Sequence, residues 1–198
     1  MNLPNKLTLI RTILVPFFLL FLFLTSVPYH NTIALFIFAI AAITDAFDGH
    51  LARKHNLVTN FGKFLDPLAD KVLVIAALVA FIELKIVSSI PVIIIIAREF
   101  MVSGLRLIAA GSGIVGAAGF SGKLKTAFTM VAIIFILVHL ALSGDFGWFG
   151  MLSNGAEATV EKYMDWATLG LIWVSTALTV ISGCVYLKSY WNLIDSDK

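Results

Sequence analysis

Four aspartates lie close together in a chain that otherwise carries few charges. Asp45 and Asp48 are three residues apart, and Asp66 and Asp70 follow at a separation of four. On helices, each spacing places both side chains of a pair on one face. Two carboxylate pairs that face each other would supply hard oxygen ligands, which suit Mg²⁺ or Mn²⁺ and suit Zn²⁺ poorly. The spacing therefore predicts a divalent-metal site.

Small and basic residues occupy the sequence between the two aspartate pairs. The full pattern is D-x2-D-G-x2-A-R-x8-G-x3-D-x3-D, filled by Asp45, Asp48, Gly49, Ala52, Arg53, Gly62, Asp66 and Asp70. Gly49 and Ala52 are small enough to let a flat base or a ribose approach the helix backbone. Arg53 can form bidentate hydrogen bonds with a phosphate. Because paired metals can grip a diphosphate, the pattern favours transfer of a phosphoryl-containing group.

The pattern matches the signature of the CDP-alcohol phosphotransferase family at every fixed position. The resemblance implies a membrane enzyme of six helices that binds a CDP-linked substrate in a cytoplasm-facing cavity, uses two Mg²⁺ or Mn²⁺ ions and forms a homodimer. It also implies that Asp45, Asp48 and Asp66 bind metal, and that Asp70 is both a ligand and the general base on the acceptor alcohol. Because a carboxylate beside cations is a weak base, we expect the metal to share this work by acidifying the hydroxyl.

The N-terminal segment adds a polar helical face. Asn5, Thr8 and Arg11 follow at three-residue spacing, which places them on one face of a helix. The alternative interpretation is ordinary helix capping with a basic membrane anchor. The residues predicted to bind CDP-diacylglycerol are Asn5, Thr8, Gly49, Ala52, Arg53 and Gly62.

Four basic residues in the segment 98–125 bear on the acceptor. Arg98 and Arg106 are eight residues apart, close to two helical turns, and therefore share a face. Glu99 can neutralise one neighbour, but positive charge remains, so a phosphate-bearing acceptor is the expected partner. The alternative, basic residues that merely flank membrane spans, fits Lys123 and Lys125 but not Arg98, which lies well inside an apolar segment.

Several segments resemble those of family members that use glycerol 3-phosphate as the acceptor. They are N-L-P-N, L-V-T-N-F-G-K-F-L-D-P-L-A-D-K, A-R-E-F and G-K-L-K-T, within residues 2–126. The resemblance implies that the primary hydroxyl of glycerol 3-phosphate attacks the β-phosphate of CDP-diacylglycerol and releases CMP. The residues predicted to bind glycerol 3-phosphate are Arg98, Arg106, Lys123 and Lys125. Inositol phosphate, serine and phosphatidylglycerol remain alternative acceptors, and a cation transporter is an alternative of another class.

Composition places these residues in a membrane. The chain has 198 residues, of which 60% are hydrophobic and only 13% charged, with mean hydropathy +0.97. Soluble proteins carry about 25% charged residues, so we predict an all-α integral membrane protein of one domain, residues 1–198, surrounded by membrane lipid. The net charge of +2 says little by itself, and we expect no nucleic-acid partner.

Hydropathy predicts six membrane-spanning helices of about 20 residues each. The predicted spans are 9–27, 32–52, 66–84, 86–110, 125–142 and 167–187. Three of them carry polar residues, which a water-filled cavity open to the cytoplasm would explain. Residues 143–165 are predicted to form an irregular external loop without chemistry.

The distribution of Lys and Arg sets the expected orientation. In the six-span arrangement twelve of the fourteen Lys and Arg residues fall on one side, and Lys85 and Lys162 fall on the other. Cytoplasmic loops carry the excess of positive charge. We therefore expect both termini and the active site to face the cytoplasm of a bacterial cytoplasmic (inner) membrane.

Overall fold

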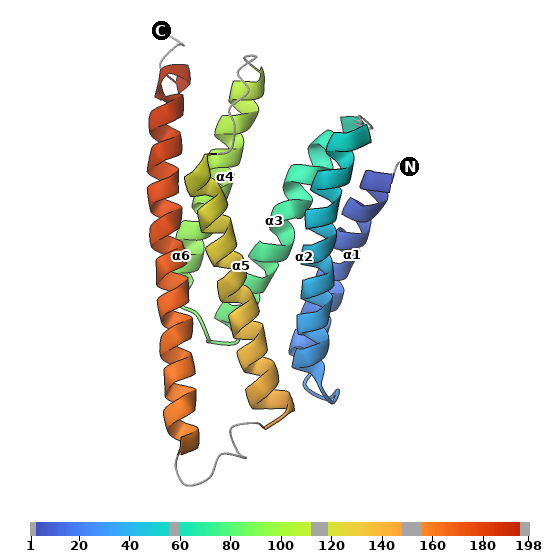
Figure 1. Cartoon of the computed structure of the whole chain (residues 1–198), viewed down its shortest axis with the longest axis vertical. Coiled ribbons are helices and arrows are strands. Elements are labelled where there is room, and N and C mark those ends of the chain that lie inside the picture. Colours follow the sequence, from blue (N-terminus) through green and yellow to red (C-terminus); the bar gives the residue numbers. More distant parts are fainter. Residues whose placement is uncertain (1–2, 56–59, 112–118, 148–155, 195–198) are drawn as a thin grey trace. The chain divides into compact units, whose positions relative to one another are not determined.

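The computed structural model describes the backbone of residues 3–55, 60–111, 119–147 and 156–194. Side chains are described for residues 9–44, 71–109, 119–147 and 158–191. This part of the chain consists of helices joined by turns and contains no strand (Figure 1). The helices are α1 (Leu3–Phe23), α2 (His30–His55), α3 (Asn60–Glu83), α4 (Ser89–Gly111), α5 (Phe120–Leu140), the π-helical turn η1 (Ala141–Asp145) and α6 (Ala156–Ile194).

Two tight turns separate helices along the chain. Tyr29 precedes α2 with φ of 59°, and Lys85 follows α3 with φ of 58°, both in the left-handed region that non-glycine residues seldom adopt. After α3 the backbone N–H groups of Ile86 and Val87 donate to the carbonyl of Phe81, which closes the end of the helix. Pro91 lies in the first turn of α4, where the helix needs no N–H donor.

The predicted irregular loop over residues 143–165 is wrong in part. η1 continues the helical path to Asp145, and α6 already begins at Ala156. The reason lies in the sequence from Ala156 to Lys162, where alanine, glutamate and lysine are strong helix formers.

The chain divides into two compact units, and each has its own core. The first unit comprises residues 1–80 and 133–166. In it α1 and α2 lie side by side (Figure 1), and the rings of Phe18 and Phe38 meet with centroids 5.6 Å apart. Both rings are fully buried, together with Ala34 and Ala41 of α2. Such small residues let two helix backbones approach closely.

The second unit comprises residues 81–132 and 167–198. Its core includes Val102 and Ala109 of α4 and Tyr186 and Tyr190 of α6. A row of small hydroxyl side chains on α6 is also buried, namely Ser175, Thr176, Thr179 and Ser182. Thr179 satisfies its hydroxyl by donating to the carbonyl of Ser175 at 2.7 Å. The polar face of α6 therefore points into this unit.

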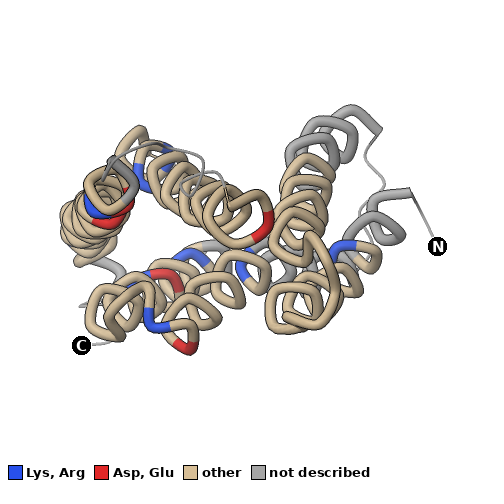
Figure 2. Tube along the Cα trace, turned by 90° about the horizontal axis from the view of Figure 1, so that it is seen from below, with Lys and Arg blue, Asp and Glu red and all other residues tan. Residues whose placement is uncertain are grey.

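The surface of the helices is apolar. Figure 2 shows few charged residues along the described helices. Large apolar side chains are exposed, among them Leu107 at 77%, Phe120 at 78% and Trp166 at 67%. In the described residues, Phe120–Asp145 and Ala158–Trp191 are long and apolar enough to cross a membrane. Such exposed apolar surface is unusual for a soluble monomer and is expected where lipid surrounds the protein.

Candidate functional site

The four motif aspartates lie within helices. Asp45 and Asp48 belong to α2, and Asp66 and Asp70 belong to α3, so the helical backbone that their spacing requires is present in both cases. Their side chains lie outside the described residues. Carboxylate oxygens are ligands that suit Mg²⁺ or Mn²⁺, so a metal site at these four aspartates stays a prediction.

The rest of the predicted donor site also lies outside the described side chains. It consists of Asn5, Thr8, Gly49, Ala52, Arg53 and Gly62. Among the residues whose side chains are described, no cluster of His, Cys, Asp and Glu is able to hold a metal ion. The metal and CDP sites therefore stay predictions from the motif.

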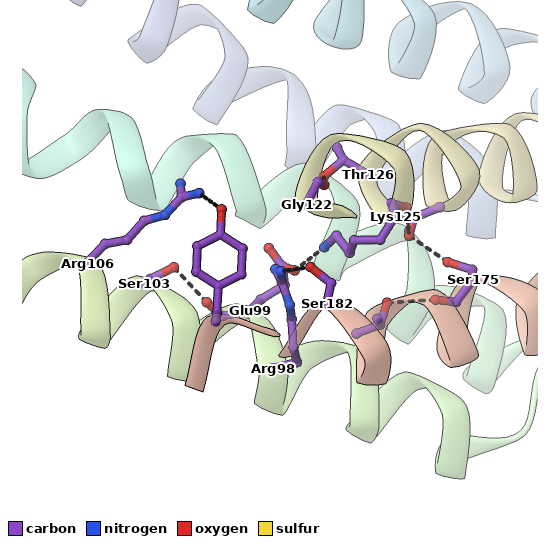
Figure 3. Close-up of polar contacts among 12 residues, drawn as sticks. Arg98, Glu99, Ser103, Arg106, Gly122, Lys125, Thr126, Ser175 and Ser182 are labelled. Carbon is purple, nitrogen blue, oxygen red and sulfur yellow. Dashed lines mark hydrogen bonds and ion pairs between the residues drawn. The ribbon is translucent and has the colours of Figure 1, made fainter. Parts of the chain in front are cut away.

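The basic residues of α4 and α5, by contrast, are described in detail. Arg98 of α4 is 8% exposed, and its guanidinium donates from Nη1 to Glu99 Oε1 at 3.0 Å and from Nη2 to Ser182 Oγ at 2.6 Å. Lys125 of α5 is 4% exposed and donates from Nζ to the same Glu99 oxygen (Figure 3). Two buried cations from different helices therefore share one carboxylate.

A glycine of α6 makes room for the Arg98 side chain. A Cβ atom at Gly183 would meet Arg98 Cγ at 3.2 Å and the methyl group of Met101 at 3.5 Å. The absent side chain thus lets the Arg98 stem pass close to the α6 backbone and reach Ser182. The buried Arg98 Nε has no hydrogen-bond partner among the described residues. This N–H group is therefore able to donate one further hydrogen bond.

Two hydroxyl groups, those of Thr129 and Ser175, lie next to the backbone of Lys125. Thr129 donates its hydroxyl proton to the carbonyl of Lys125 at 2.9 Å, and its Oγ1 lies 2.6 Å from Ser175 Oγ. Because the Thr129 proton is already used, Ser175 is the donor between these two hydroxyls. The contact ties α5 to α6 and fixes the backbone that carries Lys125 (Figure 3).

Arg106 converges with Arg98 on a tyrosine. The Arg98 and Arg106 guanidinium carbons lie 5.4 and 5.1 Å from the centroid of the Tyr186 ring, within the range of cation–π attraction. Arg106 Nη2 also donates to Tyr186 Oη at 2.5 Å. The predicted sharing of one α4 face by the two arginines is confirmed. Apart from Glu99, their hydrogen-bond partners among the described residues, Ser182 and Tyr186, are neutral.

The two lysines of the segment differ from each other. Lys123 is exposed, as expected of a basic residue that flanks an apolar helix. Lys125 is buried and paired with Glu99, so the flanking interpretation does not describe it. One feature of the sequence indicates that Lys125 lies on a polar face of its helix. Lys125 and Thr129 are four residues apart and therefore share a helical face.

Three contributors were not identified from sequence. Ser182, Gly183 and Tyr186 all contact the arginines, and all come from the last helix. Their signal is the polar row Ser175, Thr179, Ser182 and Tyr186, whose spacings of four, three and four residues mark one face of an otherwise apolar helix.

The comparisons with known proteins identify the family. Residues 1–181 match the model of the CDP-alcohol phosphatidyltransferase family, and the chain belongs to this family. The resemblance inferred from the aspartate motif is thereby confirmed.

Three relatives match this chain over nearly the whole length of both proteins, and each is named CDP-diacylglycerol–glycerol-3-phosphate 3-phosphatidyltransferase. The Bacillus subtilis (strain 168) protein is 40% identical, over 98% of this chain and 97% of the relative. The Escherichia coli (strain K12) protein is 37% identical, over 95% and 94%. The Rickettsia bellii (strain RML369-C) protein is 35% identical, over 95% and 94%.

Proposed function

We propose that this chain transfers the phosphatidyl group of CDP-diacylglycerol to the primary hydroxyl of sn-glycerol 3-phosphate. The products are phosphatidylglycerophosphate and CMP, in the biosynthesis of phosphatidylglycerol. The family and the names of the full-length relatives support the reaction. The observation that carries the choice of acceptor is the convergence of Arg98 and Arg106 on Tyr186, with a buried Arg98 Nε that has no partner among the described residues.

The acceptor's phosphate is assigned to the basic residues of α4 and α5. Arg98 and Arg106 supply planar guanidinium groups, which suit bidentate recognition of phosphate oxygens. Lys125 adds a buried ammonium next to Glu99, and Lys123 adds an exposed one. An acceptor without a phosphate group, such as serine, would bring less negative charge to these cations than glycerol 3-phosphate does.

The donor is assigned to the aspartate motif. Asp45, Asp48, Asp66 and Asp70 are proposed to hold two Mg²⁺ or Mn²⁺ ions, which neutralise the charge of the CDP diphosphate when bound. Asn5, Thr8, Gly49, Ala52, Arg53 and Gly62 are proposed to contact CDP-diacylglycerol. The small residues leave space for the nucleotide, and Arg53 pairs with a phosphate.

The transfer step exchanges one phosphorus–oxygen bond for another, so it needs no oxidant and no third substrate. The hydroxyl oxygen of glycerol 3-phosphate forms a bond with the phosphatidyl phosphorus, and the bond from that phosphorus to the bridging oxygen of CMP breaks. CMP leaves with the electron pair of the broken bond. The hydroxyl proton is proposed to pass to Asp70, the general base.

The proposed setting is a bacterial cytoplasmic membrane crossed six times. The apolar exposed faces of the helices, the bacterial relatives and the uneven distribution of Lys and Arg support this arrangement. Both termini and the active site are then cytoplasmic, and the protein is proposed to act as a homodimer in contact with membrane lipid.

The test is a transfer assay with the purified protein in mixed detergent and lipid micelles. The reaction contains Mg²⁺, CDP-diacylglycerol and one labelled acceptor, either glycerol 3-phosphate, inositol phosphate, serine or phosphatidylglycerol. We expect label to enter lipid only from glycerol 3-phosphate. Transfer to another alcohol, with none to glycerol 3-phosphate, would overturn the acceptor assignment.

A further inference from the structure

The hydroxyl of Tyr186 receives two hydrogen bonds from nitrogen donors. Arg106 Nη2 lies 2.5 Å from Tyr186 Oη, and the backbone N–H of Gly119 donates to the same oxygen at 3.1 Å. The residue is 4% exposed, so water does not surround it. These contacts join α4, the start of α5 and α6 at one phenolic oxygen.

Tyr186 Oη accepts both of these hydrogen bonds, so its own proton is still able to be donated. A phenolic oxygen accepts through its lone pairs and donates one proton, and here two N–H groups already occupy the acceptor side. No acceptor for that proton exists among the described residues. A buried donor without an acceptor is costly, so the proton is available for a ligand atom.

The surroundings of this hydroxyl specify the charge of the ligand. Two guanidinium groups lie over the ring, at 5.4 Å for Arg98 and 5.1 Å for Arg106. Gly119 directly precedes α5, so the positive end of that helix dipole lies beside Tyr186 Oη. These positive charges favour an anion as the acceptor of that hydrogen bond.

Close helix packing keeps the hydroxyl in place. A Cβ atom at Gly122 would lie 3.3 Å from Tyr186 Oη and 3.5 Å from its Cε2. On the other side the Tyr190 ring is stacked on the Tyr186 ring, with centroids 6.2 Å apart and an interplanar angle of 11°. The ring is therefore held between α5 and its own helix, and the hydroxyl is preorganised.

We propose that Tyr186 is a binding residue for the acceptor's phosphate, in addition to the basic residues. Its hydroxyl donates to a phosphate oxygen, while its ring holds the guanidinium groups of Arg98 and Arg106 in one place. This inference rests on the proposed function, because it requires a phosphorylated acceptor. It makes Tyr186 a determinant of selectivity for phosphorylated over neutral alcohols.

The test compares Tyr186→Phe with a matched control, Tyr190→Phe. Both changes remove one hydroxyl from a buried ring of the same stack, since Tyr190 is 6% exposed. We expect Tyr186→Phe to raise the KM for glycerol 3-phosphate about tenfold, the effect of losing one hydrogen bond to a charged group. The kcat and the KM for CDP-diacylglycerol should stay within about twofold, and Tyr190→Phe should resemble the wild type.

A second measurement does not depend on turnover. Inorganic phosphate should raise the midpoint of thermal unfolding of the wild type and of Tyr190→Phe, and raise that of Tyr186→Phe clearly less. An equal phosphate effect in all three proteins, or a loss of kcat with an unchanged KM for glycerol 3-phosphate, would overturn the role of Tyr186. Absence of transfer to glycerol 3-phosphate by the wild type would instead overturn the proposed function, and the phosphate measurement would still decide on Tyr186.

Discussion

At the residue scale, Glu99 is the centre of the described part of the site. Its Oε1 accepts from both Arg98 and Lys125, which come from different helices. Breaking a buried ion pair by removing one partner costs about 3–5 kcal/mol, because the remaining charge is left without compensation. Glu99 therefore holds in position two cations that are proposed to bind the phosphate of the acceptor.

This arrangement predicts the behaviour of Glu99→Gln. The variant keeps the shape of the side chain and loses its charge, so Arg98 and Lys125 repel each other. We expect a lower midpoint of thermal unfolding, and a larger stabilisation by inorganic phosphate than in the wild type, because the anion replaces the lost carboxylate. Scanning calorimetry with and without phosphate measures both. An unchanged midpoint would show that Glu99 has no such role.

The proposed general base, Asp70, is also tested by changing a single residue. Asp70→Asn keeps the size of the side chain and removes the proton acceptor, so we expect transfer to fall by about 10²–10⁴-fold. Binding of CDP-diacylglycerol, measured separately, should persist. The control is Asp165→Asn, which alters an exposed aspartate of α6 outside the motif and should transfer at the normal rate. Substantial turnover by Asp70→Asn would remove Asp70 from the base role.

At the scale of elements, Asp145 caps a helix to which it does not belong. From the end of η1 its carboxylate accepts the backbone N–H and the hydroxyl of Thr32, both at 2.6 Å, and Asn31 Nδ2 at 3.0 Å. These groups stand at the N-terminus of α2, where backbone donors lack partners within the helix. A Cβ at Gly144 would lie 2.8 Å from Asn31 Nδ2, so the glycine permits this approach.

The cap predicts a stability effect without a catalytic one. Asp145→Ala should lower the free energy of unfolding by about 1–2 kcal/mol, the range for loss of a helix cap. The KM for either substrate should not change. Chemical denaturation of the purified protein measures the first quantity and the transfer assay the second. The matched control is Asp165→Ala, and equal stability of the two variants would contradict the capping role.

The sequence predicts the helices themselves but not the contacts between them. Long apolar runs were sufficient to place a helix in each of the six predicted spans, because helix formation is local. The early start of α6 was missed because glycine and serine before Ala156 outweighed the helix formers after it. Pairing of Lys125 with Glu99, and of Arg106 with Tyr186, joins residues 26 and 80 positions apart. Only the packing of α4, α5 and α6 determines such contacts.

At the scale of the whole molecule, the proposed function requires a defined orientation in the membrane. Cys184 is the single cysteine, so a Cys184→Ser background accepts one reporter at a time. In intact cells, a membrane-impermeant thiol reagent should label Lys162→Cys, which lies on the proposed external side. It should label Lys198→Cys only after the cells are opened. Labelling of Lys198→Cys in intact cells would contradict the cytoplasmic position of the C-terminus.

The described arginines are proposed to select a phosphorylated acceptor for phosphatidyl transfer. The most direct measurement is the steady-state rate of label transfer from glycerol 3-phosphate to lipid, with each substrate varied in turn, for the wild type and Arg98→Ala. We expect transfer by the wild type. In Arg98→Ala we expect the KM for glycerol 3-phosphate to rise at least about tenfold while the KM for CDP-diacylglycerol stays unchanged. A rise confined to the KM for CDP-diacylglycerol would place Arg98 on the donor and contradict the account.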